Sequence, residues 1–194
     1  GNTADNFVYF QNFNDGTLNG WQLDDPADGT LTASATAGVG GSGGLVFDDA
    51  QGDQEFLRAP QEFLDAFPST GDLTDATLSF DVRYSTETDL NPAASITITG
   101  DGQTITLPYS ITPGQAGNVQ TVTIDLLDAT AAGVTDARLQ EILANITDFQ
   151  ISIDYNVGFP AGDEVFVDNI GLSITTAQDD NDTLEGGAGA DTLL

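Results

Sequence analysis

Short stretches in which hydrophobic and polar residues alternate recur along most of the chain and predict β-strands. The clearest covers residues 78–84, where every second residue from Leu78 to Tyr84 is apolar and Asp81 and Arg83 lie between them. A period of two residues places alternate side chains on opposite faces of a sheet. One face of this strand is therefore expected in a core and the other in solvent.

The same alternation predicts further strands over residues 149–155 and 120–126, and a hairpin in which 95–99 and 103–107 flank Gly100-Asp101-Gly102. A strand over 166–174 is also expected, but Asp168 stands where the alternation would place an apolar residue. Helix is scarce. Residues 136–144 suggest a short helix with Thr135 as its N-cap, and 62–67 a single turn. This spacing predicts one all-β sandwich.

Hydroxyl and amide side chains dominate the polar sides of these strands. Two interpretations stay open: an ordinary solvated face, or a shallow sugar-binding surface on which polar groups orient a polyol. For the second, we expect Arg83, Gln150 and Asp154 to point outward together. Trp21 and Tyr109 are either core anchors or sugar-stacking rings. The polar positions concerned are Thr97, Thr99, Thr104, Thr106, Thr121, Thr123, Gln150, Ser152 and Asp154.

The charge balance narrows the classes of partner. Asp and Glu number 31 against three arginines, with no lysine, so the formal net charge is −28. Nucleic acid and anionic membranes are disfavoured, because both require a basic footprint. Divalent cations are favoured. No apolar run is long enough to span a membrane, so no membrane insertion is expected.

The chain has no cysteine and no histidine, which excludes disulfides, thiolate chemistry and imidazole catalysis. An enzyme would have to rely on carboxylates alone. No motif singles out a catalytic pair, so we predict a non-enzyme that could be an accessory module of a larger secreted enzyme.

The composition changes after Thr176, which divides the chain into residues 1–176 and 177–194. In the second part Asp182-Thr183-Leu184 recurs nine residues later at Asp191, and residues 186–191 read Gly-Gly-Ala-Gly-Ala-Asp. This resembles the start of the nonapeptide repeats of RTX proteins. The resemblance implies calcium ions bound between stacked turns, with Asp182 and Asp191 as ligands. It also implies a secreted, bacterial parent protein exported by a type I system.

The first part resembles laminin B (laminin domain IV) in three blocks, residues 54–64, 71–84 and 139–147 running into the strand at Phe149. That resemblance implies a jelly-roll sandwich related to carbohydrate-binding modules. Residues 13–21 and 167–170 are similar to the opening and closing segments of such modules. There they imply a structural calcium held by Asn14, Asp15 and Asp168. The alternative is that Asp168 is a hydrogen-bonded structural aspartate.

Together these patterns predict a non-catalytic calcium-binding module of a secreted RTX protein, monomeric in isolation and either carbohydrate-binding or adhesive. The alternative is a structural spacer or a protein–protein interaction domain in an extracellular multidomain protein. Fold resemblance does not distinguish the two.

Overall fold

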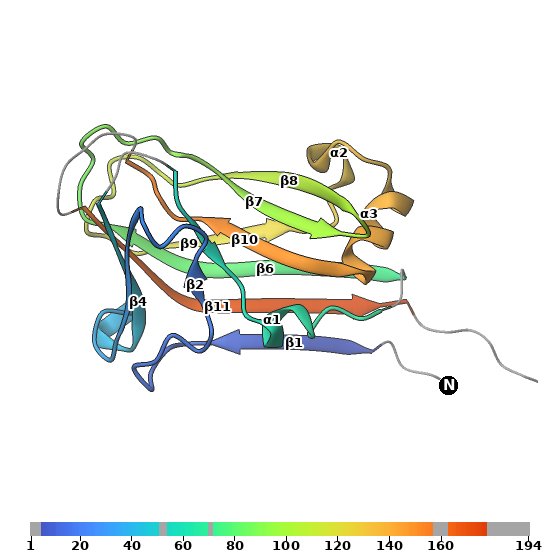
Figure 1. The fold of residues 1–194 in the computed structure, drawn as a ribbon, viewed down its shortest axis with the longest axis horizontal. Coiled ribbons are helices and arrows are strands. Elements are labelled where there is room, and N and C mark those ends of the chain that lie inside the picture. The colour runs from blue at the N-terminus through green and yellow to red at the C-terminus, as the bar shows by residue number, and fades with distance from the viewer. Residues whose placement is uncertain (1–4, 51–53, 70–71, 157–162, 178–194) are drawn as a thin grey trace, which may run out of the picture.

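The computed structural model describes residues 5–50, 54–69, 72–156 and 163–177, which form two antiparallel sheets packed face to face (Figure 1). The all-β jelly-roll sandwich expected from the sequence is confirmed. The strands are β1 (Asn6–Gln11), β2 (Gln22–Leu23), β3 (Gly29–Ser34), β4 (Gly44–Asp49), β5 (Phe56–Arg58), β6 (Leu73–Tyr84), β7 (Ala93–Gly100), β8 (Gln103–Ser110), β9 (Gln120–Asp125), β10 (Ile146–Ser152) and β11 (Glu164–Thr176).

The six-stranded sheet has the order β3-β4-β11-β6-β9, and β1 also pairs with β11. Residues 164–167 of β11 pair with β4, whereas residues 170–175 pair with β1. The shorter strands β4 and β1 therefore pair with successive parts of the same long strand, β11. Because β11 ends at Thr176, the division predicted after that residue coincides with the end of a strand. The rest of the tail lies outside the described residues, so the division stays a prediction.

The five-stranded sheet has the order β2-β5-β10-β7-β8. The predicted hairpin is present as β7 and β8, with Gly100 paired to Gln103. Its two turn residues, Asp101 and Gly102, have φ values of 46° and 71°. Positive φ at both central residues gives a turn whose twist matches that of the flanking strands.

A continuous apolar core fills the space between the sheets. The alternation in β6 has the predicted effect, because Leu78, Phe80, Val82 and Tyr84 are all buried. Strand β10 ends at Ser152, earlier than the predicted segment, although the next three residues remain buried. One side of the core is aromatic: the Phe63 ring packs against Tyr9, Trp21 and Phe149, with centroids 4.8–5.4 Å apart.

The expectation that Asp168 interrupts a core-facing row was wrong. Asp168 pairs with Asp81, which alternates outward between Phe80 and Val82, and the register of β11 shifts between Asp168 and Gly171. This β-bulge, with Asn169 at φ 51°, inserts an extra residue and moves Ile170 onto the inner face. Asp168 therefore lies on the outer face of the six-stranded sheet, where another segment buries it.

Short helices pack against the five-stranded sheet, α3 (Asp136–Ala144) on β7, α2 (Ala129–Ala132) on β8 and α1 (Gln61–Leu64) on β10. The predicted helix is α3, and the Thr135 hydroxyl accepts a hydrogen bond from Arg138 N at 3.2 Å as its N-cap. The predicted turn is α1, whereas α2 was not foreseen. None of the helices within the described ranges has the length and hydrophobicity to cross a membrane.

Candidate functional site

The outer face of the five-stranded sheet carries a polar row that crosses all five strands. The strand register aligns Gln22, Arg58, Gln150, Thr97 and Thr106 in neighbouring positions. Thr99 and Thr104 pair beside them, with their hydroxyl oxygens 2.9 Å apart. Gln150 and these four predicted threonines thus share one face, as the sequence pattern indicated.

The base on this face is Arg58 and not the predicted Arg83. Its guanidinium contacts Asp24 Oδ1 at 2.8 Å and Asp148 Oδ1 at 3.0 Å. Gln150 Nε2 donates to Asp24 Oδ1 at 3.1 Å and to Asp148 Oδ2 at 2.8 Å. The alternation around buried Leu57 points Arg58 outward, but only the pairing of β5 with β10 places it beside Gln150.

Arg83 does not lie with Gln150, and this expectation was wrong. Arg83 belongs to β6 in the other sheet, and its guanidinium carbon lies 3.9 Å from the centroid of the Phe166 ring. Its Nη2 donates to Ala37 O at 3.3 Å. Thr121 and Thr123, on β9, are likewise in the six-stranded sheet. Strand alternation alone does not say to which sheet a strand belongs, so one predicted face is in fact two.

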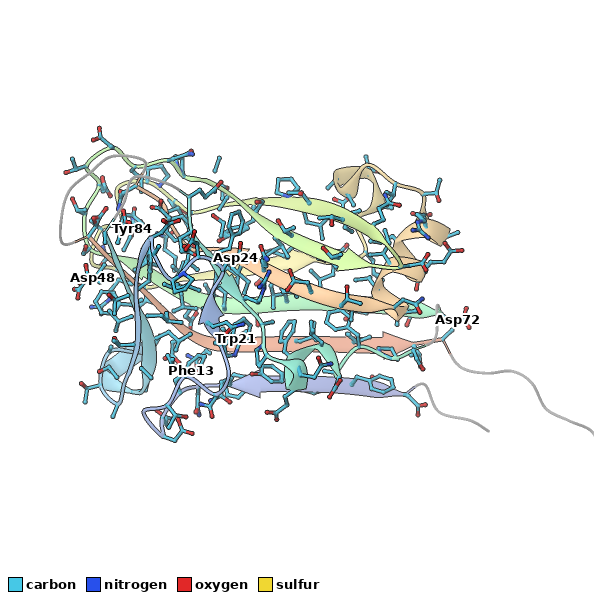
Figure 2. The ribbon with its side chains drawn as sticks, viewed as in Figure 1. Phe13, Trp21, Asp24, Asp48, Asp72 and Tyr84 are labelled. Atoms are coloured by element: carbon cyan, nitrogen blue, oxygen red, sulfur yellow. The ribbon has the colours of Figure 1, made fainter. Side chains whose placement is uncertain are left out.

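Two other predicted ligand-binding residues are buried. Asp154 follows β10, is only 6% exposed and accepts a hydrogen bond from Asn156 N at 3.0 Å. Burial raises the pKa of Asp154 to about 7, and the negative charges of nearby acids act in the same direction. Trp21 is 1% exposed and donates from Nε1 to Tyr9 Oη at 3.0 Å (Figure 2). Trp21 is a core anchor, and its ring cannot stack on a sugar.

Tyr109 lines a hollow of about 560 Å³ between β8 and β9, the edge strands of the two sheets. Its hydroxyl donates to Ser152 O and lies 2.8 Å from Tyr155 Oη, and its ring meets Phe80 edge to face. Burial raises the pKa of Tyr109 above its ordinary value, so the hydroxyl stays protonated. The other lining residues are mostly polar or small: Leu107, Pro108, Ser110, Thr112, Gln115, Gln120, Thr121, Val122, Thr123, Ile124, Asp125, Asp128 and Ala131.

Asn14 and Asp168 hold the same loop, the segment 38–43 between β3 and β4. Asn14 Oδ1 accepts from Gly43 N at 2.7 Å, and Asp168 Oδ2 accepts from Val39 N at 2.9 Å and Ser42 Oγ at 3.0 Å. Asp168 Oδ1 accepts from Asn169 N at 2.7 Å. Asp168 thus forms the hydrogen bonds expected of a structural aspartate, which was the alternative to a calcium ligand in the sequence-based prediction. Calcium at this place stays a prediction.

A side chain at Gly38 would collide with this arrangement. A Cβ there would lie 1.8 Å from Gly43 O and 2.4 Å from Asp168 Oδ2. Only glycine therefore lets the loop approach Asp168 closely enough for these hydrogen bonds.

Asp15, the third predicted ligand in this region, is exposed and folds back on its own turn. Its Oδ1 accepts from Thr17 N and Thr17 Oγ1, both at 3.0 Å, and from Asn19 Nδ2 at 3.1 Å. These hydrogen bonds lower the pKa of Asp15. The last two predicted ligands, Asp182 and Asp191, lie outside the described residues. Among residues 5–177, apart from the gaps, no three acidic side chains gather as a ready set of metal ligands.

Solved structures show the same fold in several proteins. The L4b domain of human laminin α-2 superposes with a TM-score of 0.54 at 14% identity, over 89% of this chain and 98% of that domain. The xylan-binding domain CBM22-2 of Paenibacillus barcinonensis Xyn10C gives 0.53 at 11% identity, over 87% and 99%. An exo-β-agarase gives 0.56 at 16% identity over 90% of this chain, which spans only 26% of the agarase chain.

Sequence comparison gives the family. No curated protein matches the sequence. Residues 56–185, more than half of the chain, match the family model described as Laminin B (Domain IV). The match includes β5 to β11, and hence both sheets and the Arg58–Gln150 pairing. The chain therefore belongs to the laminin B (domain IV) family.

Proposed function

We propose that this chain is a non-catalytic carbohydrate-binding module of a secreted protein, and that its glycan lies in the hollow between β8 and β9. The observation that carries the proposal is the hollow itself. Its volume of about 560 Å³ falls in the range of small-ligand sites. Its wall combines hydroxyl and amide groups with one aromatic ring.

The lining fits a polyol better than an apolar ligand. Ser110, Thr123 and Gln115 offer both donors and acceptors, and Tyr109 adds aromatic surface. Gln120 is held in place, since its amide donates to Thr112 O at 3.3 Å and accepts from Thr112 N at 2.6 Å. The likeness to a xylan-binding domain and an agarase concerns the fold alone, but it makes xylan and agarose the natural first ligands to test.

The ligand is expected to be neutral. A protein of net charge −28 repels a polyanion at low salt, and no basic residue lines the hollow. Location outside the cell is part of the proposal. It is supported by membership of the laminin B family and by the RTX-like repeat at residues 182–193. Calcium binding by the module is proposed on the same grounds.

Affinity electrophoresis and calorimetry of the purified chain with agarose, xylan, other neutral polysaccharides and an acidic one test the proposal. Two changes address the hollow. Gln115→Ala removes a donor and an acceptor, and Ala131→Trp places a ring in the space from the exposed first turn of α2. We expect about a tenfold loss of affinity from the first, since one good hydrogen bond to a sugar is worth about 1.5 kcal/mol. The second should abolish binding.

Matched controls lie on the outer face of the five-stranded sheet. Gln150→Ala and Thr106→Ala should leave affinity unchanged if the hollow is the site. Loss of binding in these two but not in Gln115→Ala and Ala131→Trp would move the site to the polar row. A folded protein that binds none of the polysaccharides would contradict the proposal and favour the structural spacer.

A further inference from the structure

A second group of oxygen-bearing side chains lies inside one end of the sandwich. Glu55 precedes β5, Asp154 and Asn156 follow β10, and Asp163 precedes β11. Backbone hydrogen bonds join these segments, from Ile153 N to Glu55 O at 3.1 Å and from Asp49 N to Asp163 O at 3.2 Å. Figure 1 shows β10 ending and β11 beginning at this same end of the molecule. Three separate parts of the chain thus bring polar side chains together.

Several of these oxygens are buried without a hydrogen-bond partner. They are Glu55 Oε2, Asn156 Oδ1 and both carboxylate oxygens of Asp163, on residues only 1–3% exposed. Glu55 is held from one side only, because Oε1 accepts from Asp24 N, Asp25 N and Phe56 N at 2.9, 3.2 and 2.9 Å. Asn156 lies beside Asp163, yet no hydrogen bond of normal geometry joins their side chains. A buried carboxylate without a partner is strongly unfavourable.

Negative charge accumulates in this group. Burial raises the pKa of Glu55 and of Asp163, and the charges of Asp49, Asp163 and Glu55 add to the rise at Asp154. Like charges in a buried region repel one another, so the ionised carboxylates are unfavourable without a counter-charge.

No basic side chain neutralises the group. The chain has three arginines and no lysine or histidine, and each arginine is engaged elsewhere in the described structure. Arg58 pairs with Asp24 and Asp148, Arg83 covers Phe166, and Arg138 contacts Glu141 at 2.8 Å and Asp101. The group is therefore neutralised either by protons, which the raised pKa values favour, or by a cation from the solvent.

We propose that a divalent cation of the calcium class binds here, with Glu55 Oε2, Asn156 Oδ1 and the Asp163 carboxylate as its side-chain ligands. Asp154 contributes further negative charge, and water or backbone oxygens complete the shell. Calcium suits a site made only of oxygen ligands from separate segments, because its coordination number and geometry are flexible, whereas Mg²⁺ requires a near-ideal octahedron. This site is separate from the place predicted at Asn14 and Asp168, and it does not depend on glycan binding.

The test is a calcium titration of the full 194-residue chain after chelation, by calorimetry and by thermal melting in calcium and in EDTA. We expect calcium at about 100 times its Kd to raise the Tm by about 5 °C or more. Glu55→Gln and Asp163→Asn should each weaken this one site about 10- to 100-fold. In EDTA both variants should melt at or above the wild-type temperature, because each removes a buried, unpaired negative charge. A purely structural role would shift the Tm equally in calcium and in EDTA.

Controls separate this site from others. Asp65→Asn changes an exposed carboxylate and should leave the titration unchanged, and Asp168→Asn should leave this site intact. If a neutralising variant fails to fold, Asn156→Asp replaces it: the added carboxylate should tighten calcium binding and lower the Tm in EDTA. Calcium that does not bind the wild type, or that binds Glu55→Gln and Asp163→Asn with unchanged affinity and number of sites, would overturn the proposal.

Discussion

Two groups of acidic side chains differ in how their negative charge is compensated. On the outer face of the five-stranded sheet, Asp24 and Asp148 share Arg58, whose side chain is 37% exposed. Inside the end of the sandwich, Glu55 and Asp163 are almost fully buried and have no base. Glu55 and Arg58 are only three residues apart. Arg58, one of only three arginines in the chain, thus lies at an exposed position, where water already screens the charges of Asp24 and Asp148.

The contrast shows where an external cation has the most to contribute. An exposed ion pair is worth little, because water solvates both partners when they separate. A buried carboxylate has no such alternative, so its stability depends on hydrogen-bond donors or on a bound ion. Asp168 is the intermediate case, since it is buried but surrounded by N–H and O–H donors.

The largest effect in this comparison is expected from Glu55→Ala. Glu55 Oε1 accepts from three backbone N–H groups in two segments, and truncation removes this acceptor from all three, although Asp24 N still donates to Phe56 O at 2.9 Å. We expect a loss of about 3 kcal/mol of unfolding free energy, with the relief of one buried charge offsetting part of the effect. Urea denaturation in EDTA measures it.

Glu55→Gln is the matched control, because an amide oxygen can replace Oε1 as the acceptor. It should retain the stability that Glu55→Ala loses. Equal losses in the two variants would show that the charge of Glu55, and not its hydrogen bonds, maintains this end of the sandwich.

A smaller effect is expected from Asp168→Ala, which removes the acceptor for Val39 N and Ser42 Oγ. The loss should be about 2 kcal/mol. It is smaller than for Glu55 because Val39 and Ser42 belong to one surface loop, whereas the hydrogen bonds of Glu55 join β5 to the segment after β2. Hydrogen exchange of the amides in residues 38–43 should rise in the same variant. Unchanged protection there would show that other contacts hold the loop.

The sequence was sufficient to predict the strands whose hydrophobic alternation is regular. Leu78 to Tyr84, the hairpin at Asp101-Gly102 and the helix after Thr135 are local features, set by side-chain period, turn conformation and N-cap. The resemblance to laminin B indicated the family, and the match to the family model confirmed it. The prediction of one sugar-binding face was wrong because Arg83 and Gln150 both lie at polar positions of alternating strands, but these strands belong to different sheets.

The site inside the end of the sandwich was not predicted as one cluster, for the same reason. Asp154 had the right alternation for an exposed residue, and Asp163 carried no motif at all. Their burial depends on how the segments after β10 and before β11 pack against β4 and Glu55, which are long-range contacts. Asp168 was predicted on the wrong face of the sheet because of one β-bulge. A single inserted residue reverses the face to which every later side chain of the strand points.

The smallest effect is expected from Arg58→Ala, which makes the exposed acidic group resemble the buried one by removing its base. Asp24 and Asp148 would then lie near each other without Arg58 between them, but both remain hydrated, and Gln150 Nε2 still donates to each. We expect a loss of no more than about 1 kcal/mol, which should shrink further in high salt. Urea denaturation at low and high salt measures it, with Gln150→Ala as the companion variant. A salt-independent loss as large as that of Glu55→Ala would mean that Arg58 stabilises the sheet through packing of its apolar stem. Charge compensation would then not explain the difference between the exposed and the buried acidic group.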